Sequence, residues 1–200
     1  ETVFAFVDDG DRLTARPAER DELRTYGEFG QQVADPFGNI VAKALSLLPH
    51  GQGWAVELEK RLPVAAGLGG GSADAGAVFR MVEAEHGLPD DWHARAAKLG
   101  ADVPACVRSE ACIGKGTGTE LANDLAGCPI LLVNPRVPVA TGPVFKAWDG
   151  EDRGALPEGN LRAIALAARN DLEAPAVAIA PVIADVLRAL RGTDPWLARM

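Results

Sequence analysis

Apolar and polar residues alternate along residues 53–59, GWAVELE. This alternation predicts a half-buried strand whose inner face carries the apolar side chains from Trp54 to Leu58. In the preceding stretch, NIVAKALSLLPH, apolar residues recur at helical spacing instead. That spacing predicts a helix with Asn39 as its N-cap and Pro49 at its end.

A longer helical pattern follows in SADAGAVFRMVEAEHGLP. Its apolar residues Ala75, Val78, Met81 and Val82 fall on one helical face, and Gly87 is the expected C-cap. The next stretch, DDWHARAAKLG, predicts a second and shorter helix. The predicted strand and the first of these two helices lie on either side of a glycine-rich stretch.

The rest of the chain is divided by weaker signals. ETVFAFV and RLTARP predict a β-hairpin with its turn at Asp9–Gly10, while ACIGKGTGTEL and PILLVNP predict further strands. From Asn160 onward the pattern is helical, and Pro181 is a suitable first residue for the last helix. Gly, Thr and Asn gather near residues 114–127, which favours a domain boundary there.

Five glycines lie between Gly67 and Gly76, directly after the predicted strand and at the start of the predicted helix. Strand, glycine loop and helix form an arrangement that binds phosphate, because the helix start offers unpaired amides and a partial positive charge. The loop is not a Walker loop, since no lysine follows the glycines. It is not a dinucleotide fingerprint either, because Ser72 occupies the third glycine position. A tight turn without a ligand is the alternative.

Composition restricts the class of protein. The 200 residues suit one large domain or two small ones, and 48% apolar with 24% charged residues is typical of a globular protein. A net charge of −8 argues against a nucleic-acid partner. No apolar run reaches the roughly 18–20 residues of a membrane span. Three unevenly spaced cysteines indicate a reducing compartment rather than a disulfide framework or a zinc site.

The stretch LPVAAGLGGGSADAG resembles the second motif of the GHMP small-molecule kinases, P-x-x-x-G-L-G-S/G-S-S/A, from Pro63 to Ala73. KLGADVPACV at 98–107 resembles a segment of one family within that group, the 4-diphosphocytidyl-2-C-methyl-D-erythritol kinases. TGPVFKAW at 141–148 and RNDLEAPA at 169–176 resemble the same family. The resemblance therefore extends over the whole chain.

This resemblance implies an α+β fold in two lobes, the first with the glycine loop and its helix and the second ferredoxin-like. It assigns residues 1–120 to the N-terminal ATP-binding domain and residues 121–200 to the C-terminal domain. The chain starts at Glu1 inside a predicted strand, and the family's P-A-K-x-N-L, D-G-Y-H and S-G-S-G-A-T motifs are absent. We therefore expect a fragment that lacks both ends and that transfers little or no phosphate by itself.

The implied activity is phosphorylation, with ATP and Mg²⁺, of the 2-hydroxyl of 4-diphosphocytidyl-2-C-methyl-D-erythritol, in non-mevalonate isoprenoid precursor synthesis in the bacterial cytoplasm. The expected partner is thus a small molecule, with no nucleic acid and no membrane. Ser72 is expected either to bind phosphate or magnesium or to cap the helix, and no residue is assigned as a metal ligand. The residues expected to surround the ATP phosphates are Pro63, Val64, Ala65, Ala66, Gly67, Leu68, Gly69, Gly70, Gly71, Ser72 and Ala73.

Outside the loop, Asp102 matches the family's catalytic aspartate, although aspartate is also common as a turn or N-cap residue. Phe145 matches the aromatic residue that stacks on the cytosine ring, and its alternative is a core phenylalanine. Thr141 and Thr117 match positions that line the substrate site. Two other functions remain open from the residues: a GHMP kinase with a different substrate, and a nucleotide-binding module without catalysis.

Overall fold

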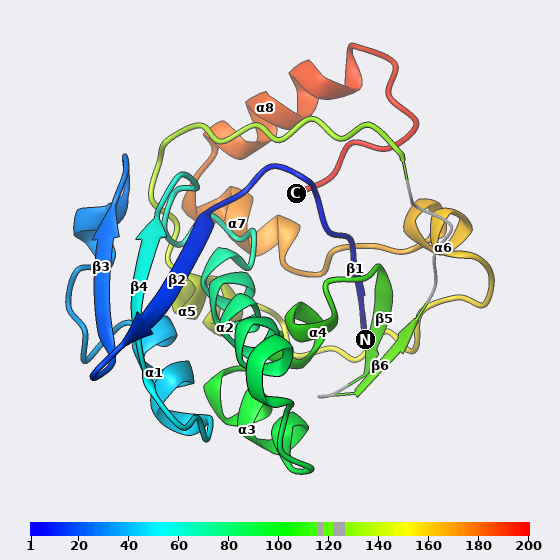
Figure 1. Cartoon of the computed structure of the whole chain (residues 1–200). Helices are drawn as coiled ribbons and strands as arrows, with labels where there is room; N and C mark the ends of the chain where they lie inside the picture. Colours follow the sequence, from blue (N-terminus) through cyan, green and yellow to red (C-terminus); the bar gives the residue numbers. More distant parts are fainter. Residues whose placement is uncertain (116–117, 122–126) are drawn as a thin grey trace.

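A computed structural model describes residues 1–115 and 127–200, and the backbone of residues 118–121 (Figure 1). It is a mixed helix-and-strand fold, as predicted. The strands are β1 (Thr2–Phe4), β2 (Arg12–Ala18), β3 (Glu22–Tyr26), β4 (Gly53–Glu59), β5 (Cys112–Lys115) and β6 (Gly118–Leu121). The helices are the 3₁₀ turn η1 (Gly30–Val33), α1 (Ile40–Leu47), α2 (Gly70–His86), α3 (Trp92–Leu99), α4 (Val103–Arg108), α5 (Thr141–Lys146), α6 (Leu161–Ala167), α7 (Glu173–Ile179) and α8 (Val182–Arg191).

The glycine loop leaves a three-stranded sheet of order β2-β4-β3, in which β4 pairs antiparallel with β2 and parallel with β3. The predicted inner face of β4 is confirmed, since Trp54, Val56 and Leu58 are all buried. Helices α1 and α2 pack together beside this sheet (Figure 1), and α3 and α4 close the same core. The core residues with no exposed surface are Val41, Ala44, Ala75, Val78, Phe79, Val82, Ala96 and Val103.

The helix boundaries in this region follow the signals in the sequence. Asn39 caps α1, because its side chain accepts a hydrogen bond of 2.8 Å from the Val41 amide. Gly87 and Gly100 occupy the C-cap positions of α2 and α3. The sequence analysis did not predict β3, η1 or α4. Each is short, and β3 has the single large aliphatic residue Leu23 on its inner face.

The predicted hairpin at the start of the chain is wrong. β1 pairs antiparallel with β5, which in turn pairs with β6, so β1 and β2 belong to different sheets. Gly114 on β5 accommodates β1, because a Cβ there would lie 2.6 Å from the Phe4 ring. The expected Asp9–Gly10 turn fails since Asp11, just beyond it, is bonded to the chain after β4.

The predicted strand in PILLVNP is also wrong. Residues 129–135 form no strand, and Ile130 to Val133 remain 46–73% exposed. Figure 1 shows this segment as a long coil. A strand needs a neighbour to receive its backbone hydrogen bonds, and this segment is not paired with any strand that the structure describes. Its attachment is polar, through an ion pair of 2.6 Å between Arg136 and Glu28.

The remaining chain is helical, as predicted from Asn160 onward. Asn160 caps α6 by accepting a 2.8 Å bond from the Ala163 amide, and Pro181 immediately precedes α8. Within residues 127–200 the ferredoxin-like sheet implied by the resemblance has no strand. None of the helices described is long and apolar enough to cross a membrane.

Candidate active site

The glycine loop joins the end of β4 to the start of α2, as the sequence predicted. Its backbone requires glycine at two points, because Gly67 and Gly69 have φ of +75° and +66°, values that side chains disfavour. Ala65 shares this left-handed conformation, with φ of +57°. A Cβ at Gly67 or Gly69 would meet nothing within 4 Å. These glycines therefore serve backbone shape and leave open space beside the loop.

The first turn of α2 has backbone donors without protein partners. Among the residues that the structure describes, no acceptor is bonded to the amides of Gly70, Gly71 or Ser72. The first paired amide is that of Ala73, which donates to the Gly69 carbonyl at 2.9 Å. Three parallel donors at the positive end of a 17-residue helix form a site for an anion.

Ser72 does not cap this helix. The N-cap position belongs to Gly69, and Ser72 lies in the first turn. Within the described part of the chain its hydroxyl has no hydrogen-bond partner. The capping alternative is therefore wrong, and the binding of phosphate or magnesium remains as a prediction.

A buried charged cluster lies beneath the loop. Lys60 Nζ donates to Asp11 and, at 2.9 Å, to Asp74 Oδ2, and all three side chains are at most 7% exposed. Burial alone would lower the pKa of Lys60, but its bonds and charge attraction to the two carboxylates outweigh burial and raise that pKa. Burial, and to a smaller extent the neighbouring Asp11, raise the pKa of Asp74 to about 6, although Lys60 acts in the opposite direction.

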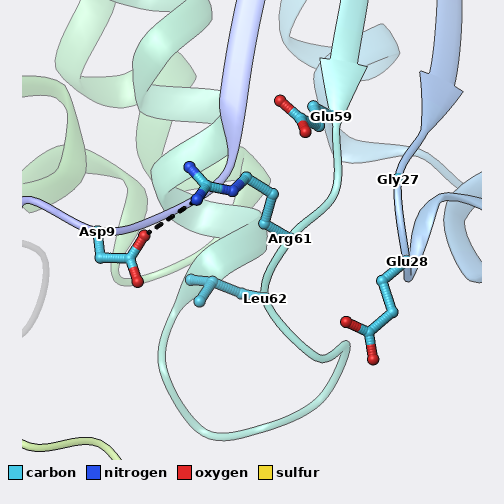
Figure 2. Close-up of a pocket in the computed structure, with 6 residues that line it drawn as sticks. All are labelled: Asp9, Gly27, Glu28, Glu59, Arg61 and Leu62. Carbon is cyan, nitrogen blue, oxygen red and sulfur yellow. Dashed lines mark ion pairs between the residues drawn. The ribbon is translucent and has the colours of Figure 1, made fainter.

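A pocket of about 310 Å³ opens beside the first residues of the loop (Figure 2). Arg61 and Asp9 form an ion pair in its wall, with Arg61 Nη2 3.7 Å from Asp9 Oδ1. Carboxylates predominate among its side chains, so the pocket suits hydroxyl or amine donors better than a phosphate. Its lining residues are Asp9, Gly27, Glu28, Glu59, Arg61 and Leu62.

Asp102 lies at the N-terminal end of α4, exposed to solvent. It occupies the N-cap position, but its side chain makes no capping bond. In the part of the chain that the structure describes, its carboxylate has no hydrogen-bond or ion-pair partner. Such an acidic group is available to a ligand.

Helix α4 is fixed against α2, the helix that starts at the glycine loop. A Cβ at Gly76 would collide with the Cys106 carbonyl, so glycine is needed for the two helices to approach. Arg80 Nη1 donates to the same carbonyl at 2.6 Å. Burial raises the pKa of Cys106 to about 12, which keeps this thiol protonated and unreactive. The two helices thus fix Asp102 relative to the loop.

The predicted substrate residues lie apart from this region in the chain. Thr141 begins α5 and is exposed, and Phe145 on the same helix is 56% exposed. The alternative of a core phenylalanine is therefore wrong for Phe145. Thr117 lies outside the described residues. No cluster of three or more His, Cys, Asp or Glu side chains that could hold a metal ion is found among the described residues.

Comparison with known proteins assigns the chain to a family. Residues 39–110 match the family described as GHMP kinases N terminal domain. The whole chain is 72% identical to a 4-diphosphocytidyl-2-C-methyl-D-erythritol kinase of Novosphingobium aromaticivorans and covers 71% of it. The chain belongs to the 4-diphosphocytidyl-2-C-methyl-D-erythritol kinase family. A kinase of the same name from Caulobacter vibrioides is 40% identical over the whole chain, which covers 77% of it.

The fold agrees with membership of this kinase family. A crystal structure of a 4-(cytidine 5'-diphospho)-2C-methyl-D-erythritol kinase superposes with a TM-score of 0.63 at 28% identity, covering 91% of this chain and 69% of that one. The resemblance stated from the motifs is thereby confirmed. The roles of individual residues in the site remain predictions.

Sequence reasoning missed the cluster of Asp11, Lys60 and Asp74. Asp11 and Lys60 are 49 residues apart and read as ordinary surface charges. One signal was present: Asp74 lies four and eight residues before Val78 and Val82, on the face predicted to be buried. A carboxylate on a buried helical face needs a partner, and Lys60 is that partner.

Proposed function

We propose that this chain provides the nucleotide site and the catalytic aspartate of a kinase that phosphorylates the 2-hydroxyl of 4-diphosphocytidyl-2-C-methyl-D-erythritol. The reaction uses ATP and serves the non-mevalonate route to isoprenoid precursors. The observation that carries the proposal is the row of unpaired amides at Gly70, Gly71 and Ser72, directly after a loop whose backbone conformation requires glycine. The identity of the acceptor substrate is inferred from the family to which the chain belongs.

ATP supplies the phosphoryl group, and the loop from Pro63 to Ala73 would hold its phosphates. The unpaired amides of the first turn of α2 would bind phosphate oxygens and offset their negative charge. The Ser72 hydroxyl would add a ligand to phosphate or to Mg²⁺, which commonly takes few protein ligands and completes its shell with phosphates and water. Catalysis of this type depends mainly on positioning and charge neutralisation.

Asp102 would accept the proton of the attacking 2-hydroxyl. Its free carboxylate meets the requirement for a general base, and the packing of α4 on α2 holds it at a fixed position relative to the loop. The exposed Phe145 would stack on the cytosine ring, with Thr141 and Thr117 beside the substrate. We further propose the cytoplasm as the compartment and a division into domains at residue 120.

The test is a coupled assay of ADP release by the full-length protein, with ATP, Mg²⁺ and the cytidine substrate, followed by ³¹P NMR of the product. We expect a new phosphomonoester at the 2-hydroxyl. Turnover only with mevalonate, homoserine or galactose would identify a GHMP kinase with another substrate. Binding of ATP without transfer to any acceptor would identify a nucleotide-binding module and contradict the proposal.

A further inference from the structure

The glycine loop is held at its two ends and not along its length. In the described part of the chain, residues 61–68 make no backbone-to-backbone hydrogen bond. Their backbone attachment is to Asp11, whose Oδ1 accepts the Arg61 amide at 2.6 Å and the Leu62 amide at 2.9 Å. Asp11 directly precedes β2, the strand that pairs with β4, and so lies outside the loop. It therefore determines where the loop begins.

The other end of the loop is anchored through Asp74 in the first turns of α2. Lys60 joins the two ends, since its ammonium group donates to Asp11 and to Asp74. This ammonium lies directly under the helix start: a Cβ on Gly70 would be 3.3 Å from Lys60 Nζ and 3.4 Å from Asp11 Oδ2. One cluster thus connects the end of β4, the start of β2 and the start of α2.

Stability alone does not account for this cluster. A buried group of one cation and two carboxylates generally stabilises a fold less than apolar residues of the same size. A cation at a helix N-terminus also opposes the helix dipole. Lys60 is too buried, and too fully bonded to carboxylates, to serve as a direct ligand of phosphate. Its effect on a ligand must pass through the loop.

We propose that Asp11, Lys60 and Asp74 are positioning residues for ATP, which fix both ends of the phosphate loop so that the amides at the start of α2 converge on the triphosphate. This inference rests on the proposed function of the loop. It makes the affinity for ATP depend on three residues that do not touch ATP. The affinity for the acceptor substrate is not expected to depend on them.

The test compares two variants of Asp11 in the full-length protein. Asp11→Ala removes both bonds to the loop amides, and we expect it to raise the KM for ATP about tenfold while the KM for the cytidine substrate changes less than about twofold. Asp11→Asn keeps one oxygen for the amides and loses the one that faces Lys60, so its KM for ATP should be intermediate. Titration of each variant with ATP and Mg²⁺ by calorimetry measures affinity without turnover.

The matched control for Asp11→Ala is Asp21→Ala, beside the opposite end of β4. Asp21 Oδ1 accepts the Trp54 amide at 3.0 Å, as Asp11 accepts amides just beyond the other end of β4. This variant should lower the melting temperature and leave the affinity for ATP unchanged. If Asp11→Ala does not fold, Lys60→Met is the alternative test. This variant removes the connection between Asp11 and Asp74 but keeps the bonds of Asp11 to the loop amides.

Unchanged affinity for ATP in folded Asp11→Ala or Lys60→Met would overturn the inference. Equal losses for ATP and for the cytidine substrate would overturn it too, because they indicate a general structural role. A wild-type protein that binds ATP but transfers no phosphate contradicts the proposed function instead. In that case the calorimetric comparison still decides whether the cluster positions the loop.

Discussion

Residues 1–115 and residues 127–200 use their apolar side chains differently. In the first region, β4, α1, α2, α3 and α4 direct them into one core, where Val78 and Phe79 have no exposed surface. In the second region Leu161 and Ile164 are buried, but several large apolar side chains remain at the surface, including Leu131 at 73% exposed and Phe145 at 56%. The first region contains the predicted ATP site, and most of the predicted substrate contacts fall in the second.

The difference shows when a hydrophobic pattern determines structure. The alternating segment GWAVELE forms a strand because β2 and β3 pair with it on either side and two helices cover its inner face. The apolar run PILLV is equally suited to a strand, yet it has no strand partner among the described residues. A pattern specifies a strand only together with its neighbours.

The largest effect is expected at the edge of the well-packed region. Asp102→Ala should reduce kcat by about 10²–10⁴-fold in the full-length protein, because the attacking hydroxyl loses its proton acceptor. Its melting temperature should stay that of the wild type, since the carboxylate is exposed and makes no capping bond. Steady-state kinetics and thermal unfolding measure the two quantities.

Asp91→Ala is the matched control for Asp102→Ala. Asp91 also lies at an exposed N-cap position without a capping bond, and it pairs with Arg95 at 2.7 Å on the surface. This control should keep its activity and nearly all of its stability, because an exposed ion pair contributes little. Near wild-type turnover by folded Asp102→Ala would remove the catalytic role from this residue.

Two phenylalanines test the contrast between the regions directly. Phe79→Ala should lower the free energy of unfolding by about 3–5 kcal/mol, because a fully buried ring leaves a cavity. Phe145→Ala should change it by less than about 0.5 kcal/mol and instead raise the KM for the cytidine substrate. Urea unfolding and kinetics give both values. A large loss of stability in Phe145→Ala would show that its ring supports the packing of the second region.

The buried cluster should give the first region a distinctive pH dependence. Burial raises the pKa of Asp74 from 3.8 to about 6 in the folded state, so between these values the folded protein binds more protons than the unfolded chain. The contribution of Asp74 to stability is therefore greatest below about pH 4 and is lost as the pH rises through 6. The charged or titratable groups that face it are Lys60, directly after β4, Asp11, directly before β2, and Cys106 of α4.

Asp74→Asn lacks this titration. Relative to the wild type, its free energy of unfolding should improve between pH 4 and pH 7 by up to about 3 kcal/mol. Urea unfolding at several pH values measures the difference. A constant difference across this range would mean that Asp74 is already charged at pH 4 in the folded protein.

How much the sequence predicted depends on how local each signal is. The Asn39 cap, the Gly87 C-cap and the loop glycines were predictable because the residues that determine them lie within a few positions. The pairing of β1 with β5 spans more than 100 residues, and nothing in TVF specifies that partner. The hairpin was the nearest pairing, and it was wrong.

The residues of the candidate site also differ in how local their sequence signals are. The loop and Asp102 were predicted as site residues from contiguous motifs, and among the described residues their first amides and carboxylate have no partner. The cluster of Asp11, Lys60 and Asp74 joins three separate elements, so only the position of Asp74 on a buried helical face indicated it. Function carried by one segment is readable from sequence, whereas support assembled from several segments requires the fold.

The smallest effect is expected at Gly70, where the loop meets the cluster. A Cβ there would contact Lys60 Nζ and Asp11 Oδ2 at 3.3–3.4 Å, so a larger side chain would displace the cluster and shift the first turn of α2 that carries the amides. Gly70→Val should therefore weaken the affinity for ATP about tenfold, or about 1.4 kcal/mol, and leave that for the cytidine substrate unchanged. Gly51→Val, at a glycine with nothing within 4 Å of its Cβ, controls for the same chemical change. Calorimetric titration with each ligand decides the point, and equal losses for both ligands would make the loop a structural turn.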